Sequence, residues 1–398
     1  MENVKVIDAV MGAGKTTFML DYINEASPEK KFIYITPFLD EVERVKKSVT
    51  NRTFFSPTNA VEGGRKLTSL KRLVEDGANI AATHALFEMA DDELIDLLMA
   101  SDYVLVLDEV MDVITRASVS QADMRLLIDK SFIRIENNRV EWVASELEYD
   151  SGRFDDIRLL ARAGTLFYHR DSFLVWAFPS QVFRAFSEVY VMTYLFPAQI
   201  QKYYFELFQV PYELKSIKAG QLIEHDTKAD NRPELRQLID LYDGDHNRHG
   251  EGRTAFARGW LSRRDPEDFE VMKRSMYSYV RRIAKAKSTD VMWTTLKDYR
   301  YELAGRGYSK GFVAVNARAT NQYADRNTLI YAYNRFMNPE ERGFFQDNGV
   351  TVNEDLLAVS DLLQWVWRSC IRNGESIKLY IPSSRMRRLL NEWSNYEL

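Results

Sequence analysis

Short apolar runs alternate with helical patterns along the first 110 residues of the chain. The runs are apolar at nearly every position, which is typical of strands buried on both faces of a sheet. In the segments between them, apolar residues recur three and four positions apart, as in amphipathic helices. This alternation predicts a doubly wound parallel sheet. We expect strands at Val4–Ile7, Lys31–Thr36, Asn79–Thr83 and Asp102–Asp108, and helices at Thr17–Ile23, Leu39–Val49, Leu67–Glu75 and Leu86–Met99.

The remainder of the chain divides into three regions. Residues 115–175 contain short alternating runs, of which Phe132–Glu136 and Arg139–Val143 predict a hairpin, so we interpret this region as an insertion. The stretch 225–265 is rich in Asp, Gly, Arg and His and is the expected connector. Alternating strand and helix patterns resume at Val291 and continue to the end of the chain, which predicts a second α/β lobe.

Composition restricts the class of protein. The chain has 398 residues, of which 45% are hydrophobic and 13% aromatic, so it is long enough for two domains with large cores. No apolar run approaches the roughly 20 residues of a membrane span, and we expect no signal peptide, because the sequence begins directly with an expected strand. The single cysteine, Cys370, excludes an intrachain disulfide and a multi-cysteine zinc site. We therefore expect a cytoplasmic protein.

The segment after the first strand has the pattern of a phosphate-binding loop. Ala9 is followed by four residues and then by Gly14-Lys15-Thr16, between an expected strand and an expected helix, which is the P-loop arrangement. Lys15 is expected to reach the β- and γ-phosphates of a nucleotide, and the Thr16 hydroxyl to hold Mg²⁺. A glycine-rich helix cap with a chance Gly-Lys-Thr is the alternative interpretation. The residues expected to bind the nucleotide are Gly12, Ala13, Gly14, Lys15, Thr16 and Thr17.

Two carboxylates, Asp108 and Glu109, end the strand that begins at Asp102. Such an apolar strand belongs in the centre of a parallel sheet, and these sheets bind ligands at the carboxyl ends of their strands. Asp108 is therefore expected to hold Mg²⁺ through water, and Glu109 to orient or deprotonate the water that attacks the γ-phosphate. The two acids could instead cap a following helix. With a P-loop pattern in the same chain, ATP hydrolysis is the favoured interpretation.

One stretch is strongly basic although the net charge of the chain is −5. Between Val271 and Arg318, eleven Lys or Arg residues stand against three acids. Basic residues mixed with aromatics suit a phosphate backbone and stacked bases. A solvated basic face whose aromatics belong to the core is the alternative. The aromatic residues of this stretch are Tyr277, Tyr279, Trp293, Tyr299, Tyr301 and Tyr308.

The order of these motifs resembles that of superfamily 2 helicases, and most closely the compact helicases of bacteriophage replication modules. The P-loop resembles motif I of these proteins, and Asp108-Glu109-Val110-Met111 resembles motif II. The other segments that resemble helicase motifs are Tyr34–Pro37 (motif Ia), Ala82–Phe87 (the next DNA-side motif), Val189–Tyr194 (motif III), Val291–Thr295 (motif IV), Val313–Asn321 (motif V) and Gln364–Arg372 (motif VI).

The resemblance implies an α/β fold with two RecA-like P-loop NTPase lobes, each with a parallel sheet, and a β-rich insertion in the first. Lobe 1 would span residues 1–215, a connector 216–265 and lobe 2 266–398. ATP and Mg²⁺ would bind between the lobes, and single-stranded or forked DNA, or RNA, would lie across both. Replication proteins would be possible partners, in the host cytoplasm if a phage encodes the protein. The residues implied to contact the nucleic acid are Thr36, Pro37, Thr83, His84, Thr193, Asn316 and Arg318.

Helical periodicity at Leu356–Ile371 agrees with motif VI. Gln364, Arg368 and Arg372 stand four residues apart, so one helix face would present an amide and two guanidinium groups. A guanidinium supplied by a second lobe can stabilise the charge on the transferred γ-phosphate, with an effect on rate of roughly 10³–10⁵. These three residues are therefore catalytic candidates together with Glu109. The alternative is a basic helix that faces solvent.

The leading hypothesis is an ATP-dependent helicase or translocase on single-stranded DNA, acting in phage DNA replication or recombination. One alternative is a nucleotide-switched DNA-binding or loading ATPase that unwinds nothing, since the chain has no obvious additional unwinding domain. A thymidine-type nucleoside kinase is a further alternative, because Met11–Thr17, Phe38–Asp40 and the pair Asp108-Glu109 resemble the nucleotide-binding core of those enzymes. The chain lacks the cysteines of their zinc element and is much longer than that fold needs.

Overall fold

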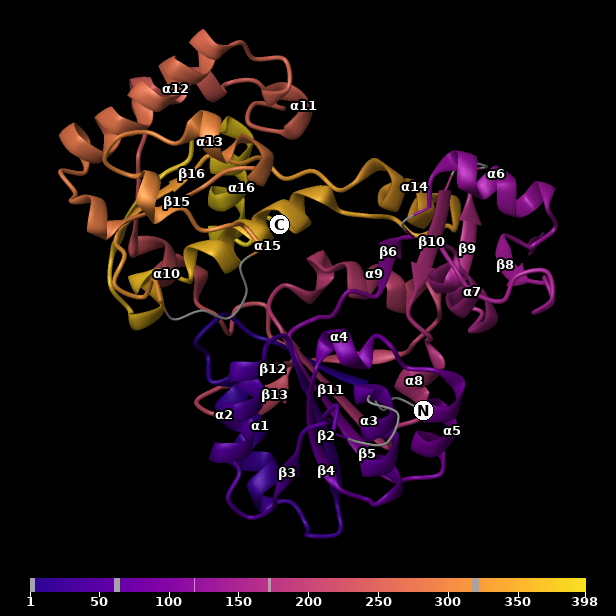
Figure 1. Cartoon of the computed structure of the whole chain (residues 1–398). Helices are drawn as coiled ribbons and strands as arrows, with labels where there is room; N and C mark the ends of the chain where they lie inside the picture. The colour runs from indigo at the N-terminus through magenta and orange to yellow at the C-terminus, as the bar shows by residue number, and fades with distance from the viewer. Residues whose placement is uncertain (1–3, 61–64, 118, 171–172, 317–321) are drawn as a thin grey trace.

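Three separate sheets organise the protein (Figure 1). The structure, a computed structural model, describes residues 4–60, 65–117, 119–170, 173–316 and 322–398. The largest sheet has the strand order β13-β12-β1-β11-β5-β2-β4-β3, and we call the part of the chain built on it lobe 1. Its strand pairs are parallel, apart from the hairpin of β12 and β13. The strands are β1 Val4–Asp8, β2 Lys31–Thr36, β3 Phe54–Phe55, β4 Asn79–Thr83, β5 Tyr103–Asp108, β11 Glu188–Thr193, β12 Tyr212–Lys218 and β13 Gln221–Glu224.

The central strands of lobe 1 are buried on both faces. In β5, Leu105 and Leu107 belong to the core on one face of the sheet, and Val104 and Val106 belong to the core on the other. Because successive side chains of a strand point to opposite faces, the uninterrupted apolar run supplies both cores. The helices of lobe 1 are α1 Lys15–Glu25, α2 Leu39–Ser48, α3 Lys66–Glu75, α4 His84–Phe87, α5 Asp92–Met99, α8 Gln181–Arg184 and α9 Ile200–Leu207.

The predicted parallel sheet is confirmed, but the helix predicted at Leu86–Met99 is wrong. The structure has two helices there, α4 ending at Phe87 and α5 beginning at Asp92. The carboxylate of Asp91 accepts a hydrogen bond of 3.0 Å from the backbone N–H of Leu94. An aspartate in this position caps the start of a new helix, and the apolar periodicity alone does not reveal the break.

The predicted β-rich insertion is a five-stranded sheet that follows β5 in the chain. Its strand order is β6-β10-β9-β8-β7, and its described pairs are antiparallel. The predicted hairpin is confirmed as β7 and β8, which pair Ile133 with Trp142. The elements of the insertion are β6 Ile114–Arg116, α6 Gln121–Asp129, β7 Ile133–Glu136, β8 Arg139–Trp142, α7 Asp155–Arg162, β9 Leu166–His169 and β10 Phe173–Ala177.

The third sheet is parallel and forms the base of lobe 2, with the order β14-β17-β16-β15. The stretch 225–265, the predicted connector, contributes β14 to this sheet by pairing with β17. The core of lobe 2 packs α15 and α16 against the sheet. The elements are α10 Arg232–Gln237, β14 Ile239–Leu241, α11 Arg258–Leu261, α12 Pro266–Ser278, β15 Val291–Thr294, α13 Arg300–Leu303, β16 Thr328–Tyr331, α15 Glu354–Val366, β17 Ile377–Tyr380 and α16 Ser384–Ser394.

One helix leaves lobe 2 and packs on the insertion. This helix, α14 Pro339–Asp347, lies between β16 and α15 in the chain but beside β6, β9 and β10 in space (Figure 1). Phe344 belongs to the hydrophobic core that includes the insertion, and its ring contacts the ring of Phe167. Arg116 of β6 donates two hydrogen bonds of 2.8 Å to the carboxylate of Glu340. The helix therefore ties lobe 2 to the insertion of lobe 1.

Candidate functional site

The P-loop and the two predicted acids lie at the carboxyl ends of the central strands of lobe 1. The P-loop follows β1, Asp108 is the last residue of β5, and Thr193 is the last residue of β11, which runs between these two strands. The register pairs Asp8 with Thr193 and Asp108 with Met192. Because parallel strands have their carboxyl ends on the same side of the sheet, the fold brings the P-loop and Asp108 together although they are almost 100 positions apart in the chain. Such sheets bind ligands at this end of their strands.

The conformation of the P-loop depends on its glycines. Gly12 and Gly14 have φ angles of +85° and +88°, in the left-handed region that strains residues with a Cβ. Helix α1 begins at Lys15, and no side chain caps its first turn. The N–H groups of a first helical turn have no partner inside the helix, so they are available to an anion. The loop therefore has the local structure that its sequence pattern predicts.

The ammonium group of Lys15 is held by its own loop. Its ammonium group donates hydrogen bonds to the carbonyl oxygens of Ala9 and, at 3.2 Å, of Val10, both in its own loop. Burial lowers the pKa of Lys15, and the negative charges of Glu109, Asp8 and Asp108 oppose this effect, with Glu109 contributing most. The acids at the end of β5 therefore act electrostatically on the Lys15 ammonium group.

Asp108 is held by residues of the neighbouring strand and helix. The hydroxyl of Tyr34 donates a hydrogen bond of 3.1 Å to its Oδ2 atom, and Arg44 lies 4.0 Å from the same oxygen. Burial and the adjacent charge of Glu109 raise the pKa of Asp108 to about 6. The Asp108 carboxylate and the Thr16 hydroxyl are oxygen donors of the kind that Mg²⁺ prefers. The residues present therefore fit a magnesium ion.

Backbone strain marks the residue after Asp108. Glu109 has a φ of +80°, and its N–H donates a hydrogen bond of 2.9 Å to the carbonyl of Met192 in β11. A left-handed conformation in a residue other than glycine costs about 1–3 kcal/mol and is found preferentially at functional sites. This bond to the central strand holds the strained backbone from which the Glu109 side chain extends.

The segment after β11 connects the P-loop strand to the rest of the site. Asp8 accepts hydrogen bonds from the backbone N–H groups of Leu195 (2.7 Å) and Phe196 (3.0 Å). The side chain of Gln201 accepts a hydrogen bond of 3.0 Å from the N–H of Met111, next to the acids. The side chain of Gln199 donates a hydrogen bond of 2.9 Å to Ser360 of lobe 2. No motif in the sequence indicates these roles, because the hydrogen bonds depend on the tertiary arrangement.

The P-loop lies between the two lobes. Val10 and Met11 pack against the hydrophobic core of lobe 2. A Cβ atom placed on Gly12 would lie 3.9 Å from the carbonyl oxygen of Arg372, which belongs to the segment that resembles motif VI. A phosphate bound to this loop would therefore lie close to lobe 2.

The predicted arrangement of Gln364, Arg368 and Arg372 on one helix face is wrong. Helix α15 ends at Val366, and Arg372 belongs to a separate 3-10 turn, Cys370–Asn373. Ser369 between them is extended, and its hydroxyl donates a hydrogen bond of 2.7 Å to the carbonyl of Val366. A serine hydroxyl that bonds to a nearby carbonyl offers the backbone an alternative to the helix.

The two arginines consequently have different environments. Arg368 is 8% exposed, and its guanidinium donates a hydrogen bond of 3.0 Å to the carbonyl of Val315, in the segment that resembles motif V. Arg372 is exposed. Of the two, Arg372 has the more exposed side chain, and its backbone carbonyl lies beside Gly12 of the P-loop.

The predicted nucleic-acid contacts differ in accessibility. The side chains of Thr36, His84 and Thr193 are buried, with 0%, 5% and 0% exposure. A nucleic-acid strand therefore cannot reach them in this conformation. Pro37 and Thr83 are half-buried, and Asn316 is exposed. Arg318 lies outside the described residues.

The aromatics of the basic stretch belong mainly to the core, as in the alternative interpretation of this region. Tyr279, Trp293 and Tyr308 are almost completely buried in a core of lobe 2, against which Tyr277 and Tyr299 also pack. Tyr301 differs, with 81% exposure. The stretch can present positive charge to a phosphate backbone, but most of its aromatic rings are not available for stacking with bases.

The fold and the site define an α/β protein of two lobes, with a P-loop at the carboxyl end of a central strand of its larger sheet. The chain belongs to the YonV family. It is 40% identical over 407 residues to the SPbeta prophage-derived uncharacterized protein YonV of Bacillus subtilis (strain 168), covering 99% of both chains. Residues 114–176 match the YonV middle domain and residues 233–394 the YonV C-terminal Rossmann-like domain. The first range coincides with the insertion, and the second contains the parallel sheet of lobe 2.

Solved structures similar to this chain have low sequence identity to it. S. tokodaii Xpd4 is 12% identical and has a TM-score of 0.49, covering 100% of this chain and 94% of that one. The DUF1998 helicase MrfA, in a structure bound to DNA and AMPPNP, is 11% identical and has a TM-score of 0.36, covering 100% of this chain and 48% of that one. Among the described residues, no helix is long and apolar enough to cross a membrane.

Proposed function

We propose that this protein is an ATPase whose hydrolysis of ATP is coupled to nucleic acid. One observation carries the proposal: the P-loop that contains Lys15 follows β1, and Asp108 and Glu109 lie at the end of β5, so the fold places them at the carboxyl ends of the same parallel strands, where such sheets bind ligands. A cation that binds phosphate and acids that hold a metal or activate water are the parts that phosphoryl transfer to water requires.

The chain's own groups have separate roles in this proposal. The N–H groups at the start of α1 and the ammonium of Lys15 bind the phosphates, for which Lys15 leaves the carbonyls of its own loop. Thr16 and Asp108 would hold Mg²⁺, which neutralises phosphate charge when it is bound. Glu109 orients the attacking water and accepts its proton.

Coupling to nucleic acid follows in this proposal from the position of the P-loop between the lobes. Arg372 lies in the segment of lobe 2 that adjoins Gly12, so a change at the γ-phosphate alters the contact between lobe 1 and lobe 2. We infer that single-stranded DNA lies across the two lobes and that ATP turnover moves them along it, as in a helicase or translocase. The similarity to a prophage-derived protein suggests a role in phage DNA replication or recombination.

A nucleotide-switched DNA-binding protein that does not translocate is the second candidate. The docked helix α14 favours it, because Phe344 and the pair Arg116–Glu340 hold lobe 2 to the insertion and restrict its movement. Displacement of streptavidin from the end of a biotinylated single strand distinguishes the two functions. A translocase displaces streptavidin in an ATP-dependent manner, whereas a switch binds and releases the strand with ATP turnover but leaves the streptavidin in place.

A further inference from the structure

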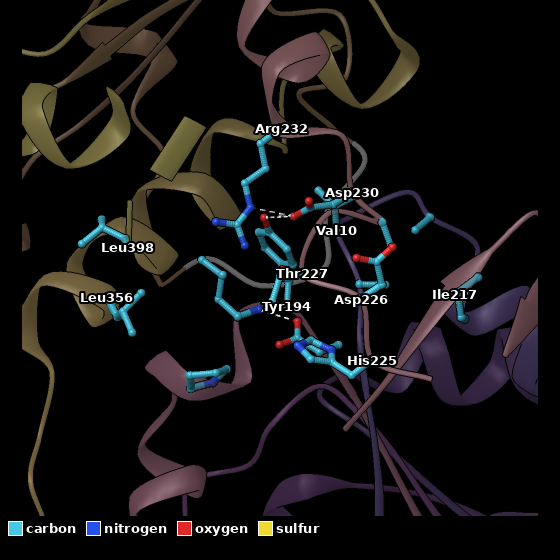
Figure 2. A pocket seen from close by; sticks show the side chains of 16 residues that line it. Val10, Tyr194, Ile217, His225, Asp226, Thr227, Asp230, Arg232, Leu356 and Leu398 are labelled. Carbon is cyan, nitrogen blue, oxygen red and sulfur yellow. Dashed lines mark hydrogen bonds and ion pairs between the residues drawn. The ribbon is translucent and has the colours of Figure 1, made fainter. Parts of the chain in front are cut away.

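A cavity of about 280 Å³ adjoins the P-loop (Figure 2). The P-loop contributes Ala9, Val10 and Ala13 to its wall. The other walls come from the segment after β11, through Tyr194, Leu195 and Pro197, from the end of β12, from the segment after β13 and from lobe 2, through Leu356 and Leu398. The volume is near the lower end of the roughly 300–1,000 Å³ that small-molecule sites occupy. The cavity can therefore hold part of a nucleotide.

The strand order fixes the direction in which a nucleotide must lie on this P-loop. Asp108 and Glu109 lie on one side of β1, beyond β11, so the γ-phosphate has to face that side. The nucleoside end must then point the opposite way, across β1 toward β12. The cavity extends from the residues after β11 across β1 to that side, where Ile217 near the end of β12 and His225 after β13 line it.

The walls of the cavity suit a heterocyclic base and a sugar. Val10, Ile217, Leu356 and Leu398 provide apolar surface. Asp230 provides a buried acceptor: its Oδ2 atom receives hydrogen bonds from Tyr194 (2.6 Å) and Arg232 (3.0 Å). Its Oδ1 atom is buried and has no hydrogen-bond partner within the described part of the chain. A buried oxygen without a donor destabilises the protein, and a hydrogen bond from a ligand N–H or O–H group would offset this cost.

We propose that this cavity binds the base and ribose of the nucleotide whose phosphates the P-loop holds. The inference rests on the proposed function and specifies how the same site recognises its substrate. Asp230 accepts a hydrogen bond from a donor of the nucleoside, which is either a ribose hydroxyl or an amino group of the base. Leu356 and Leu398 belong to lobe 2, so a nucleoside bound in the cavity contacts lobe 2 directly.

Binding of two probes, each with Mg²⁺, tests the proposal by titration calorimetry. AMPPNP carries the nucleoside and the phosphates, whereas inorganic tripolyphosphate carries the phosphates alone. The variant Ala229→Trp places a large side chain on the cavity wall without changing the P-loop. Asp230→Asn preserves the shape of the side chain and removes its charge. The same titrations with dAMPPNP and with GMPPNP show whether the donor to Asp230 is the 2′-hydroxyl or belongs to the base.

We expect the wild-type protein to bind AMPPNP at least tenfold more tightly than tripolyphosphate. Ala229→Trp should lose this preference while its affinity for tripolyphosphate stays within twofold, which also shows that the variant folds. Asp230→Asn should weaken the binding of AMPPNP and leave the binding of tripolyphosphate unchanged. An unchanged preference in both variants would overturn the cavity proposal and leave the P-loop function intact. Failure of the wild-type protein to bind either probe would overturn both.

Discussion

The indole N–H of Trp393 donates a hydrogen bond of 2.8 Å to the hydroxyl of Tyr194. Trp393 belongs to α16, near the end of the chain, and Tyr194 directly follows β11, the strand between the P-loop and the acids. Tyr194 in turn donates to Asp230, and the Arg232 guanidinium lies over the Trp393 ring at 5.7 Å. Lobe 2 is thereby joined to the centre of the proposed active site by a continuous set of buried polar contacts.

Removal of the indole donor should weaken this connection between the lobes. Trp393→Phe leaves the buried Tyr194 hydroxyl without one partner, so we expect a loss of about 1–2 kcal/mol in the free energy of unfolding. We also expect reduced stimulation of ATP hydrolysis by DNA. Trp142→Phe is the matched control, because it removes an indole bond of 3.2 Å to Ala144 inside the insertion. Urea unfolding and ATPase assays on both variants check this, and equal effects on DNA stimulation would contradict it.

The role of Glu109 predicts a variant that binds nucleotide but does not hydrolyse it. Glu109→Gln keeps the size of the side chain and removes the proton acceptor, so turnover should fall by about 10²–10⁴. Affinity for AMPPNP should change little. Asp102 directly precedes the same strand, at its amino end and away from the site. Asp102→Asn is therefore the control and should behave as the wild type. Turnover above one tenth of the wild-type rate in Glu109→Gln would remove this residue from the mechanism.

The two arginines of the segment that resembles motif VI should give different phenotypes. Arg372→Ala should reduce turnover by about 10³ if it supplies the charge that stabilises the γ-phosphate, with little change in thermal stability because the residue is exposed. Arg368→Ala should lower the free energy of unfolding by about 1.5–3 kcal/mol, because it removes a charged donor from the Val315 carbonyl. Thermal unfolding measured beside ATPase rates separates the two effects. The reverse pattern would assign the catalytic role to Arg368.

The attachment of α14 to the insertion should depend on pH. Hydrogen bonds from Arg170, which directly follows β9, and from His169 lower the pKa of Asp347 to about 2. A folded-state pKa below the ordinary value stabilises the fold above about pH 4, and this contribution is lost as the pH falls toward 2. Asp347→Asn should therefore lower the urea midpoint more at pH 6 than at pH 3. The exposed acid Asp129 of α6 provides the control variant, Asp129→Asn, and a pH-independent difference for Asp347→Asn would contradict the assignment.

The elements of lobe 1 could be predicted because their sequence patterns are local. The strands Lys31–Thr36 and Asn79–Thr83 have the predicted bounds, since an apolar run is sufficient to indicate a buried strand. The P-loop could be located because the turn requires glycine at the positions with positive φ, as found at Gly12 and Gly14.

The features that could not be predicted depend on contacts between distant residues. Helix α15 ends at Val366, and the Ser369 hydroxyl bonds to the carbonyl of that residue, a contact that helical periodicity does not reveal. The docking of Phe344 on the insertion and the burial of Thr193 at the centre of the sheet result from tertiary packing. The order of the motifs along the chain indicated the candidate site residues. The exposure of these residues and their hydrogen-bond partners depend on the tertiary fold.

The central claim is that the P-loop hydrolyses ATP in response to nucleic acid. The most direct test is the steady-state ATPase rate with and without single-stranded DNA, measured on the wild-type protein and on Lys15→Ala. We expect DNA to increase the rate severalfold in the wild type and to have no effect in Lys15→Ala, which should show no turnover above background. A wild-type rate that responds to neither DNA nor RNA, or a stimulated rate that survives in Lys15→Ala, would contradict the account.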